Sequence, residues 1–204
     1  MKIAVYGATG MIGSSIATEA LSRGHEVTAI SRRGDAGPDG STAEQGDMGD
    51  AAGVRDVAGR HDVIVTATGP SRTGGSHEPW LAAIQTLIDN AEAARVLVVG
   101  GAGSLLPGPN GPRLLDLEAF PAAYRQEAIT GAASLDAFRT APDSLDWTYL
   151  SPAPEIAPGE RTGHYTVGTD QLVGDRISVE DYAVAMVDEI EQRQHPRTRF
   201  TVAS

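Results

Sequence analysis

The sequence predicts an α/β fold: a doubly wound, mostly parallel sheet with helices on both faces. Three observations predict it. Strand-like and helix-like segments alternate along most of the chain, which implies parallel strands joined by right-handed crossovers. The expected strands are continuous apolar runs, as in DVIVTAT at residues 62–68, and such runs are typical of strands covered on both faces. A glycine-rich turn directly follows the first of these runs.

The composition predicts one domain spanning residues 1–204, because 204 residues with 41% hydrophobic content can bury a core without disulfides or structural metal ions. The chain has no cysteine, which excludes disulfides and thiolate sites and fits a reducing, cytoplasmic location. A formal net charge of -11 argues against nucleic acid and anionic membranes as partners. Met1 leads directly into a strand, so no signal peptide is expected.

The first half of the chain alternates most regularly. Its helices and strands follow apolar patterns, Gly24 provides a helix end, and glycine and proline mark a loop before the third strand. The expected elements are a strand over Lys2–Tyr6, a helix over residues 11–23, a strand over 26–30, a loop over 34–41, a short strand over Thr42–Gln45, a helix near 50–58 and a strand over 62–68.

The second half is less regular. An apolar stripe from Trp80 to Ile88 predicts a helix, and SVED at residues 178–181 predicts a helix start with a hydroxyl cap. Irregular segments near 102–121 and 151–178 are expected on the substrate side of the domain. The expected elements are a helix over 79–94, a strand over Arg95–Val99, a loop over 102–120, a helix over 121–139, a strand over 146–150, a loop over 151–163, a helix over 178–192 and a strand over 199–202.

The turn GATGMIG, residues 7–13, is the strongest functional signal. A glycine turn between the first strand and first helix is where such sheets bind dinucleotides. Gly7 permits a tight turn, Gly10 lets the backbone approach a pyrophosphate, and Gly13 lets the helix pack on the strand. The alternative is an ordinary glycine-bearing turn. The residues expected to contact the cofactor here are Gly7, Thr9, Gly10, Met11, Ile12 and Gly13.

The end of the second strand indicates which dinucleotide binds. A carboxylate there binds the ribose of NAD, whereas arginine accommodates the 2′-phosphate of NADP. The sequence has Arg32 and Arg33, with no acid before Asp35, and therefore favours NADP(H) over NAD(H). Two solvated surface arginines are the alternative.

Two further segments are expected beside the cofactor. Asp47, with Met48 next to it, follows the third strand and is placed to meet the adenine amino group; a helix cap at Asp47 is the alternative. Ala67, Thr68 and Gly69 end the fourth strand at the expected groove.

The chain resembles an atypical short-chain dehydrogenase/reductase. More narrowly, it is similar to the NmrA-like NAD(P)H-binding group that includes NADH–flavin reductases related to biliverdin reductase B. The resemblance covers nearly the whole chain and rests on GATGMIG, VVGGAGSLL (residues 98–106), LDWTYLSPAPEIAPGERTGHYTVGTDQLV (145–173), ISVEDYAVAMVDEIE (177–191) and RFTVAS (199–204). It implies a Rossmann-type fold, a nicotinamide cofactor and hydride transfer, with a flavin as a possible substrate. It also implies that Ser151, Pro152 and Ala153 line the nicotinamide pocket, with a proline turn as the alternative.

The catalytic Tyr-x-x-x-Lys pair of typical short-chain dehydrogenases is missing. Its lysine lowers the pKa of the tyrosine so that the tyrosine can exchange a proton with substrate. Tyr124 lies near the expected position, but Ala128 replaces the lysine, and Lys2 is the only lysine in the chain. Ser104 is a candidate hydrogen-bond donor to the nicotinamide amide or to the acceptor, with a loop cap as the alternative.

The remaining ionisable residues give weaker signals. The five histidines show no ligand spacing, and no metal site is expected. His25 and His61 precede strands and are expected in solvent, while the roles of His77 and His164 stay open. Three loop arginines could attract an anionic acceptor or be solvated: Arg72, Arg113 and Arg161.

These observations favour an NAD(P)H-dependent reductase that passes hydride to a flavin or a similar conjugated small molecule. Such an acceptor delocalises the added charge, so a missing proton relay is tolerated. An NADP(H)-binding redox sensor without turnover is the alternative. An epimerase ranks last because its chemistry needs the tyrosine base.

Overall fold

The computed structural model describes residues 1–204 and consists of sixteen short elements. The strands of the main sheet are β1 (Lys2–Tyr6), β2 (Glu26–Ser31), β3 (Thr42–Gln45), β4 (Val63–Thr66), β5 (Arg95–Val99), β6 (Trp147–Pro152), β8 (Thr166–Gly168) and β10 (Thr198–Ala203). The other elements are α1 (Met11–Ser22), α2 (Ala51–Arg60), α3 (Glu78–Asn90), the 3₁₀ helix η1 (Leu114–Asp116), α4 (Ala122–Arg139), β7 (Glu155–Ala157), β9 (Arg176–Ser178) and α5 (Val179–Gln192).

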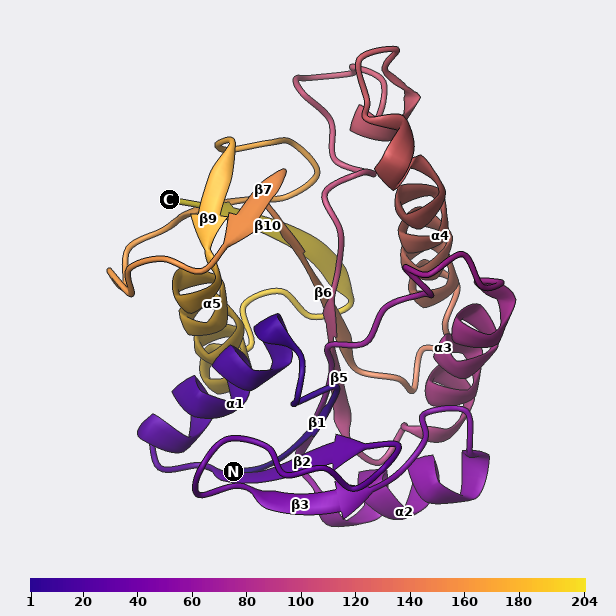
Figure 1. Cartoon of the computed structure of the whole chain (residues 1–204), viewed down its shortest axis with the longest axis vertical. Coiled ribbons are helices and arrows are strands. Elements are labelled where there is room, and N and C mark those ends of the chain that lie inside the picture. Colours follow the sequence, from indigo (N-terminus) through magenta and orange to yellow (C-terminus); the bar gives the residue numbers. More distant parts are fainter.

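The main sheet is mostly parallel, as predicted. Its eight strands lie in the order β3-β2-β1-β4-β5-β6-β10-β8, and only the edge strand β8 runs antiparallel to its neighbour. Figure 1 shows this sheet crossing the middle of the molecule, with helices to either side. The chain order reverses beside β1, which pairs with β2 on one side and β4 on the other. Sheets of this kind bind ligands at such a reversal, beyond the carboxyl ends of the strands.

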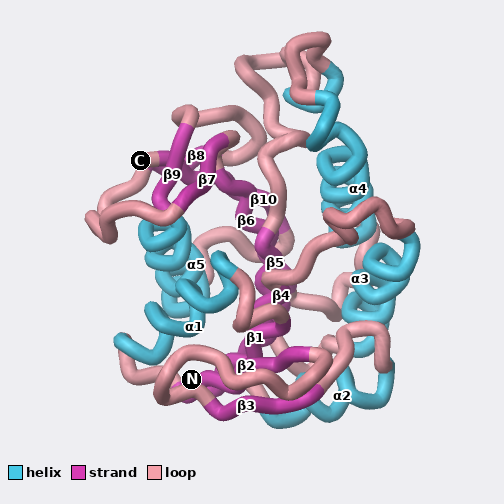
Figure 2. Tube along the Cα trace, viewed as in Figure 1, coloured by secondary structure: helices cyan, strands magenta, loops and turns pink.

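Helices cover both faces of the sheet, which confirms the doubly wound architecture. One core joins α1 and α5 to the sheet through residues such as Ile16, Tyr182 and Leu97. The other joins α2, α3 and α4 through residues such as Val54, Ile84 and Phe138. Figure 2 shows the two helical layers on opposite sides of the strands. The strands between them are buried on both faces, which explains their continuous apolar sequences.

Local signals set several element boundaries where the sequence predicts them. Gly24 follows α1 with φ of +82°, a conformation that favours glycine. Ser178 caps α5, since its Oγ accepts a hydrogen bond from the N–H of Asp181 at 3.0 Å. The helix then ends at Gln192, as expected.

The structure corrects the expected boundaries around the irregular segments. β6 continues through Ser151 and Pro152, which were expected to begin a loop; they pair with Thr201 and Val202 of β10. Pro152 is tolerated because β5 pairs with β6 only as far as Leu150. The segment 151–178 also contains β7, β8 and β9, and β7 pairs with β9 in a separate two-stranded sheet. Conversely, β4 ends at Thr66 and α3 at Asn90, both earlier than predicted.

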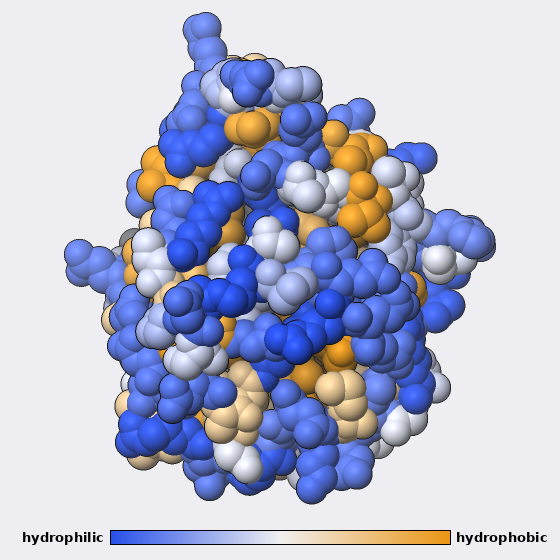
Figure 3. Space-filling view, turned by 180° about the vertical axis from the view of Figure 1, so that it is seen from behind, coloured by the Kyte–Doolittle hydropathy of each residue, from blue (hydrophilic) through white to orange (hydrophobic).

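The surface is mainly polar. Figure 3, seen from behind, shows a largely hydrophilic face on which apolar side chains form small separate patches. No helix has the length and apolar character needed to cross a bilayer.

Candidate functional site

The glycine turn packs tightly against the end of β4. Gly7 has φ of +84°, and a Cβ there would lie 2.7 Å from the carbonyl oxygen of Ala67. A Cβ on Gly13 would lie 2.2 Å from the carbonyl oxygen of Gly7. Neither position can hold a larger side chain without moving backbone. The turn therefore holds the start of α1 against the segment Ala67–Gly69 because both glycines lack side chains.

The start of α1 is open to a ligand. Gly10 is the N-cap, and no side chain caps the helix. The N–H of Ser14 donates to Gly10 at 2.8 Å, but the N–H groups of Met11, Ile12 and Gly13 donate to no group of the protein. Thr9, Gly10 and Met11 are exposed. Three free N–H groups at the positive end of a helix dipole form a site for an anion such as a pyrophosphate.

Gly10 leaves room for a pyrophosphate to approach the backbone at the start of α1. Its φ of -84° is open to any residue, and a Cβ there would meet only the carbonyl oxygen of Gly7, at 3.4 Å. A side chain at this position would therefore occupy the space in front of the helix rather than disturb the fold.

The structure places Arg32 and Arg33 just beyond the end of β2, next to the glycine turn in the sheet, since Gly7 N–H donates to the Ile30 carbonyl at 3.1 Å. The two arginines differ. Arg33 donates from Nε to Asp35 Oδ2 at 2.9 Å, which raises the pKa of the already basic Arg33 guanidinium. The Arg32 guanidinium is exposed and forms no ion pair. Either side chain can reach solvent at the edge where a ribose phosphate would lie.

Asp47 and Met48 lie after β3, but neither behaves as a helix cap. Asp47 Oδ1 accepts from the N–H of Gly49 at 2.8 Å, whereas Asp50 caps α2 by accepting from the N–H of Ala52 at 3.0 Å. The capping alternative for Asp47 is therefore wrong. The Met48 side chain is buried in the core under α2 and α3, so only its backbone can face a ligand.

The segment after β4 is held beside the glycine turn. Ala67 donates its N–H to the carbonyl of Tyr6 at 2.9 Å. Thr68 Oγ1 is 3.0 Å from Thr66 Oγ1 and accepts from Trp80 Nε1 at 3.1 Å, which fixes its orientation. Gly69 has open space where a Cβ would be. The structure thus brings together Ala67, Thr68 and Gly69 with Gly7 and Gly13.

Ser151, Pro152 and Ala153 lie at the carboxyl end of β6, with all three side chains buried. The Ser151 hydroxyl has no hydrogen-bond partner in the protein. The side chains of this segment do not reach the surface, so any contact between it and a nicotinamide uses the backbone.

Ser104 has a partner that the sequence does not reveal. Its Oγ accepts a hydrogen bond from Arg199 of β10 at 3.2 Å. Arg199 is buried and also donates from Nε to Asp170 Oδ1 at 2.8 Å. Because Ser104 accepts this bond, its own hydroxyl hydrogen remains free to donate to another group. No sequence signal pointed to Arg199, which lies 95 residues away.

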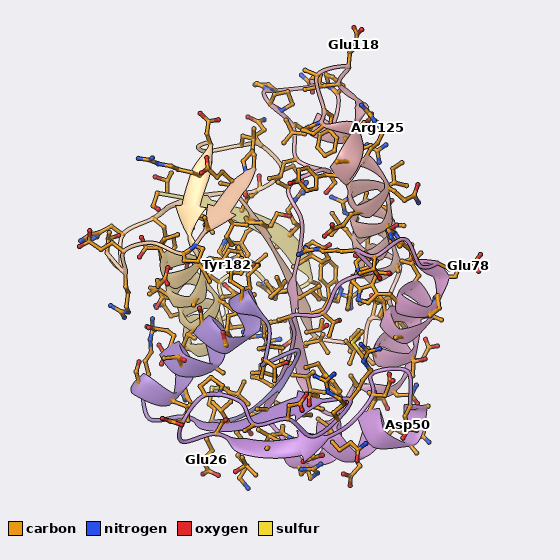
Figure 4. All side chains as sticks on the ribbon, in the orientation of Figure 1. Glu26, Asp50, Glu78, Glu118, Arg125 and Tyr182 are labelled. Carbon is orange, nitrogen blue, oxygen red and sulfur yellow. The ribbon has the colours of Figure 1, made fainter.

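The structure contains no tyrosine–lysine relay at the expected place. Ala128 packs directly on Gly103, where an added Cβ would lie 2.6 Å from the Ala128 Cβ. Tyr124 is 64% exposed in the first turn of α4. Burial raises the pKa of Tyr149 and of Tyr182 above the usual range, and Figure 4 shows Tyr182 between α5 and the sheet. These two buried tyrosines are therefore held in the protonated form and do not act as bases at neutral pH.

Most of the remaining candidates have structural partners. His77 occupies the N-cap position of α3, but its side chain forms no capping hydrogen bond. Its ring lies between Thr130 Oγ1, at 2.7 Å, and the carbonyl of Ser71, at 3.0 Å. His61 is buried and bonded to Thr28 and Val57, so its expected solvation is wrong. His164 is exposed. No group of three or more His, Asp or Glu side chains is arranged to hold a metal ion. The three loop arginines form ion pairs: Arg72 with Glu127, Arg113 with Asp116 and Arg161 with Glu19.

Comparison with known proteins decides the family. The sequence pattern of the NAD(P)H-binding family matches residues 7–193, which include the glycine turn and all five helices. The chain belongs to the NAD(P)H-binding family. The free N–H groups at the start of α1 lie in the part of the chain that this family shares.

Three similar proteins of known structure match this chain over 99% or more of its length. A protein from Burkholderia pseudomallei, provisionally described as exported, is 43% identical with a TM-score of 0.89, and all of both chains is covered. A provisionally assigned epimerase from Bacteroides thetaiotaomicron is 34% identical with a TM-score of 0.87, covering 99% of this chain and 96% of that one. A provisionally assigned NADH–flavin reductase from Streptococcus pneumoniae is 32% identical with a TM-score of 0.85, covering 100% and 99%.

Proposed function

We propose that this protein is a reductase that takes hydride from NADPH, in preference to NADH, and passes it to a flavin or a similar conjugated small molecule. The observation that carries the proposal is the uncapped start of α1, with three free N–H groups behind a turn that excludes side chains. The proposal includes a cytoplasmic location, supported by the absence of cysteine.

The residues of this chain fit a dinucleotide in three places. Met11, Ile12 and Gly13 offer N–H groups to the pyrophosphate, and Thr9 adds an exposed hydroxyl beside them. Arg32 and Arg33 would hold the 2′-phosphate. Asp47 and the backbone at Met48 would contact the adenine, and the segments that follow β4 and β6, ending in Gly69 and Ala153, would contact the nicotinamide.

The bound nicotinamide supplies the hydride. The protein contributes by holding donor and acceptor rings together, which is a proximity effect. Ser104 has a free hydroxyl hydrogen that can orient the nicotinamide amide or the acceptor. A conjugated acceptor spreads the charge that hydride brings, so water can deliver the proton later. The absence of a tyrosine–lysine pair is therefore compatible with this reaction, whereas it would be a serious deficit for an epimerase or an alcohol dehydrogenase.

A sensor that binds NADP(H) without turnover is the second candidate. It is favoured by Ala128, which packs on Gly103 at the position where typical short-chain dehydrogenases carry the relay lysine. The sensor needs only the dinucleotide site and a surface that changes with cofactor state.

The test follows the absorbance of NADPH when FMN, FAD or riboflavin is added. The reductase consumes NADPH with at least one of them, and Gly10→Asp abolishes consumption because a carboxylate then faces the pyrophosphate. Gly10→Asn is the matched control, since its side chain fills the same space without the charge; it should retain more activity than Gly10→Asp. Tight NADPH binding without consumption across flavins, quinones and biliverdin would instead favour the sensor.

A further inference from the structure

Arg32 and Arg33, which follow β2, differ in whether a carboxylate pairs with the guanidinium. Arg33 contacts Asp35 through both Nε and a terminal nitrogen, each 2.9 Å from Oδ2. No carboxylate pairs with Arg32, although its main chain is fixed by a hydrogen bond from Gln45 Nε2 to its carbonyl at 3.0 Å. One guanidinium is therefore ready for an anion, and the other already holds one.

The local backbone builds the Arg33–Asp35 pair. Gly34 donates its N–H to the Ser31 carbonyl at 3.2 Å and has φ of +71°, which turns the chain back on itself. The N–H of Asp35 then donates to Ser31 Oγ at 2.8 Å. These two bonds to Ser31 fix the backbone on both sides of the turn and bring the Asp35 carboxylate against Arg33.

We propose that Asp35 sets the cofactor selectivity of the site by competing with the 2′-phosphate for Arg33. This inference rests on the proposed function. A 2′-phosphate that approaches the Nε–Nη2 edge of Arg33 must displace Asp35, and on any approach to Arg33 it is repelled by the nearby carboxylate. NADH carries a hydroxyl at that position and meets neither cost. Arg32 makes the first contact with the phosphate, and Asp35 limits how much Arg33 adds.

The pair is exposed, which limits the size of the effect. The Arg33 side chain is 84% exposed and that of Asp35 43%. Water and salt screen such a pair, so a phosphate dianion can displace the carboxylate. The carboxylate therefore tunes the preference for NADPH over NADH without preventing NADPH from binding.

The test measures dissociation constants of NADPH and NADH by calorimetry at low ionic strength for wild type and Asp35→Asn. The variant should bind NADPH roughly three- to tenfold more tightly, with NADH binding unchanged. Asp39→Asn is the matched control, because it removes the same charge from the same loop at an exposed residue that forms no ion pair. It should change neither constant beyond about twofold.

Two further results decide the inference. In an Arg33→Ala background, Asp35→Asn should lose the part of its effect that comes from competition for Arg33 and keep only the relief of direct repulsion, so its gain in NADPH affinity should be smaller. If Asp35→Asn still binds NADPH with the affinity of wild type, the proposed role of Asp35 is overturned, while the proposed function stands. Weakened NADH binding would overturn that role too, because Asp35 would then be a ribose ligand. Absence of nucleotide binding by wild type would overturn the proposed function and this inference with it.

Discussion

At the scale of single residues, the three glycines of the first turn have separate roles. Gly7 and Gly13 are required by packing, since a Cβ at either would meet carbonyl oxygen at 2.7 or 2.2 Å. Gly10 has space for a side chain and is required by the ligand instead. Substitutions at Gly7 or Gly13 should therefore lower stability, whereas substitutions at Gly10 should weaken dinucleotide binding.

Gly13→Ala tests the packing role. The added methyl must displace the Gly7 carbonyl, and overpacking of this kind costs about 1–3 kcal/mol. The free energy of unfolding, measured with urea, should fall by that amount in Gly13→Ala and by much less in Gly10→Ala. Equal stability of Gly13→Ala and wild type would contradict the packing in this turn.

Ser104→Ala tests the proposed donor. Loss of one hydrogen bond costs about 1 kcal/mol, so kcat with a flavin should fall roughly fivefold. The pH profile of kcat should keep its shape, because the hydroxyl orients groups and does not titrate in the working range. If Ser104→Ala is as fast as wild type, the Ser104 hydroxyl does not orient the nicotinamide or the acceptor, and its role is the contact with Arg199.

At the scale of elements, a buried ion cluster joins the start of β5 to the end of α5. Glu189 accepts a hydrogen bond from Arg95 and another from His195 Nδ1, the latter at 2.7 Å. Arg95 also donates to Thr148 Oγ1 of β6 at 2.8 Å. Burial opposes the charge on Glu189, but the bonds from His195 and Arg95 outweigh it, so the pKa lies below the usual 4.5. The carboxylate is therefore held in its charged form.

This cluster predicts how stability depends on pH. A carboxylate with a lowered pKa in the folded state contributes stability above pH 4.5, and that contribution is lost as pH falls through the folded pKa. The lowered pKa of Glu19, caused first by the hydrogen bond from Arg161, acts in the same direction. Urea unfolding should show falling stability from pH 5 to pH 3.

Glu189→Gln isolates the contribution of the cluster. At neutral pH it should destabilise the protein by about 3 kcal/mol, because the buried Arg95 loses its closest counter-charge and keeps only Asp146, 3.8 Å away. Below pH 4.5 the gap between variant and wild type should shrink. A gap that stays constant down to pH 3 would show that Glu189 does not titrate with folding.

The irregular segments near 102–121 and 151–178 are held by individual side-chain and backbone hydrogen bonds rather than by long helices or strands. Arg125, labelled in Figure 4 beside the start of α4, donates to the carbonyls of Leu117 and Phe120 at 3.1 and 3.2 Å. Leu106 exchanges backbone hydrogen bonds with Asp170 and Leu172, each at 2.9 Å. The Arg125 bonds hold the first irregular segment to α4, and the Leu106 bonds join it to the second irregular segment.

At the scale of the whole molecule, signals that lie within a few residues predicted the fold well. Apolar runs located the central strands, the stripe from Trp80 located α3, and Ser178 located the start of α5. The same local signals found the glycine turn. These features follow from backbone geometry and burial, which a short stretch of sequence encodes directly.

Contacts between distant residues could not be predicted in the same way. The pairing of Glu155 with Arg176 produced two unexpected strands, and the bond from Arg199 to Ser104 links residues 95 positions apart. Which arginines hold carboxylates, as Arg33 does, depends on loop conformation. The sequence therefore indicated which residue types surround the site, and the structure indicated which of them are free to bind.

The most direct test of the account is calorimetric titration of the purified protein with NADPH. The free N–H groups of Met11, Ile12 and Gly13 predict saturable binding of one NADPH per chain, which Gly10→Asp abolishes while the protein remains folded by circular dichroism. Absence of binding by wild type, or equal binding by Gly10→Asp, would contradict the assignment of this turn as the dinucleotide site.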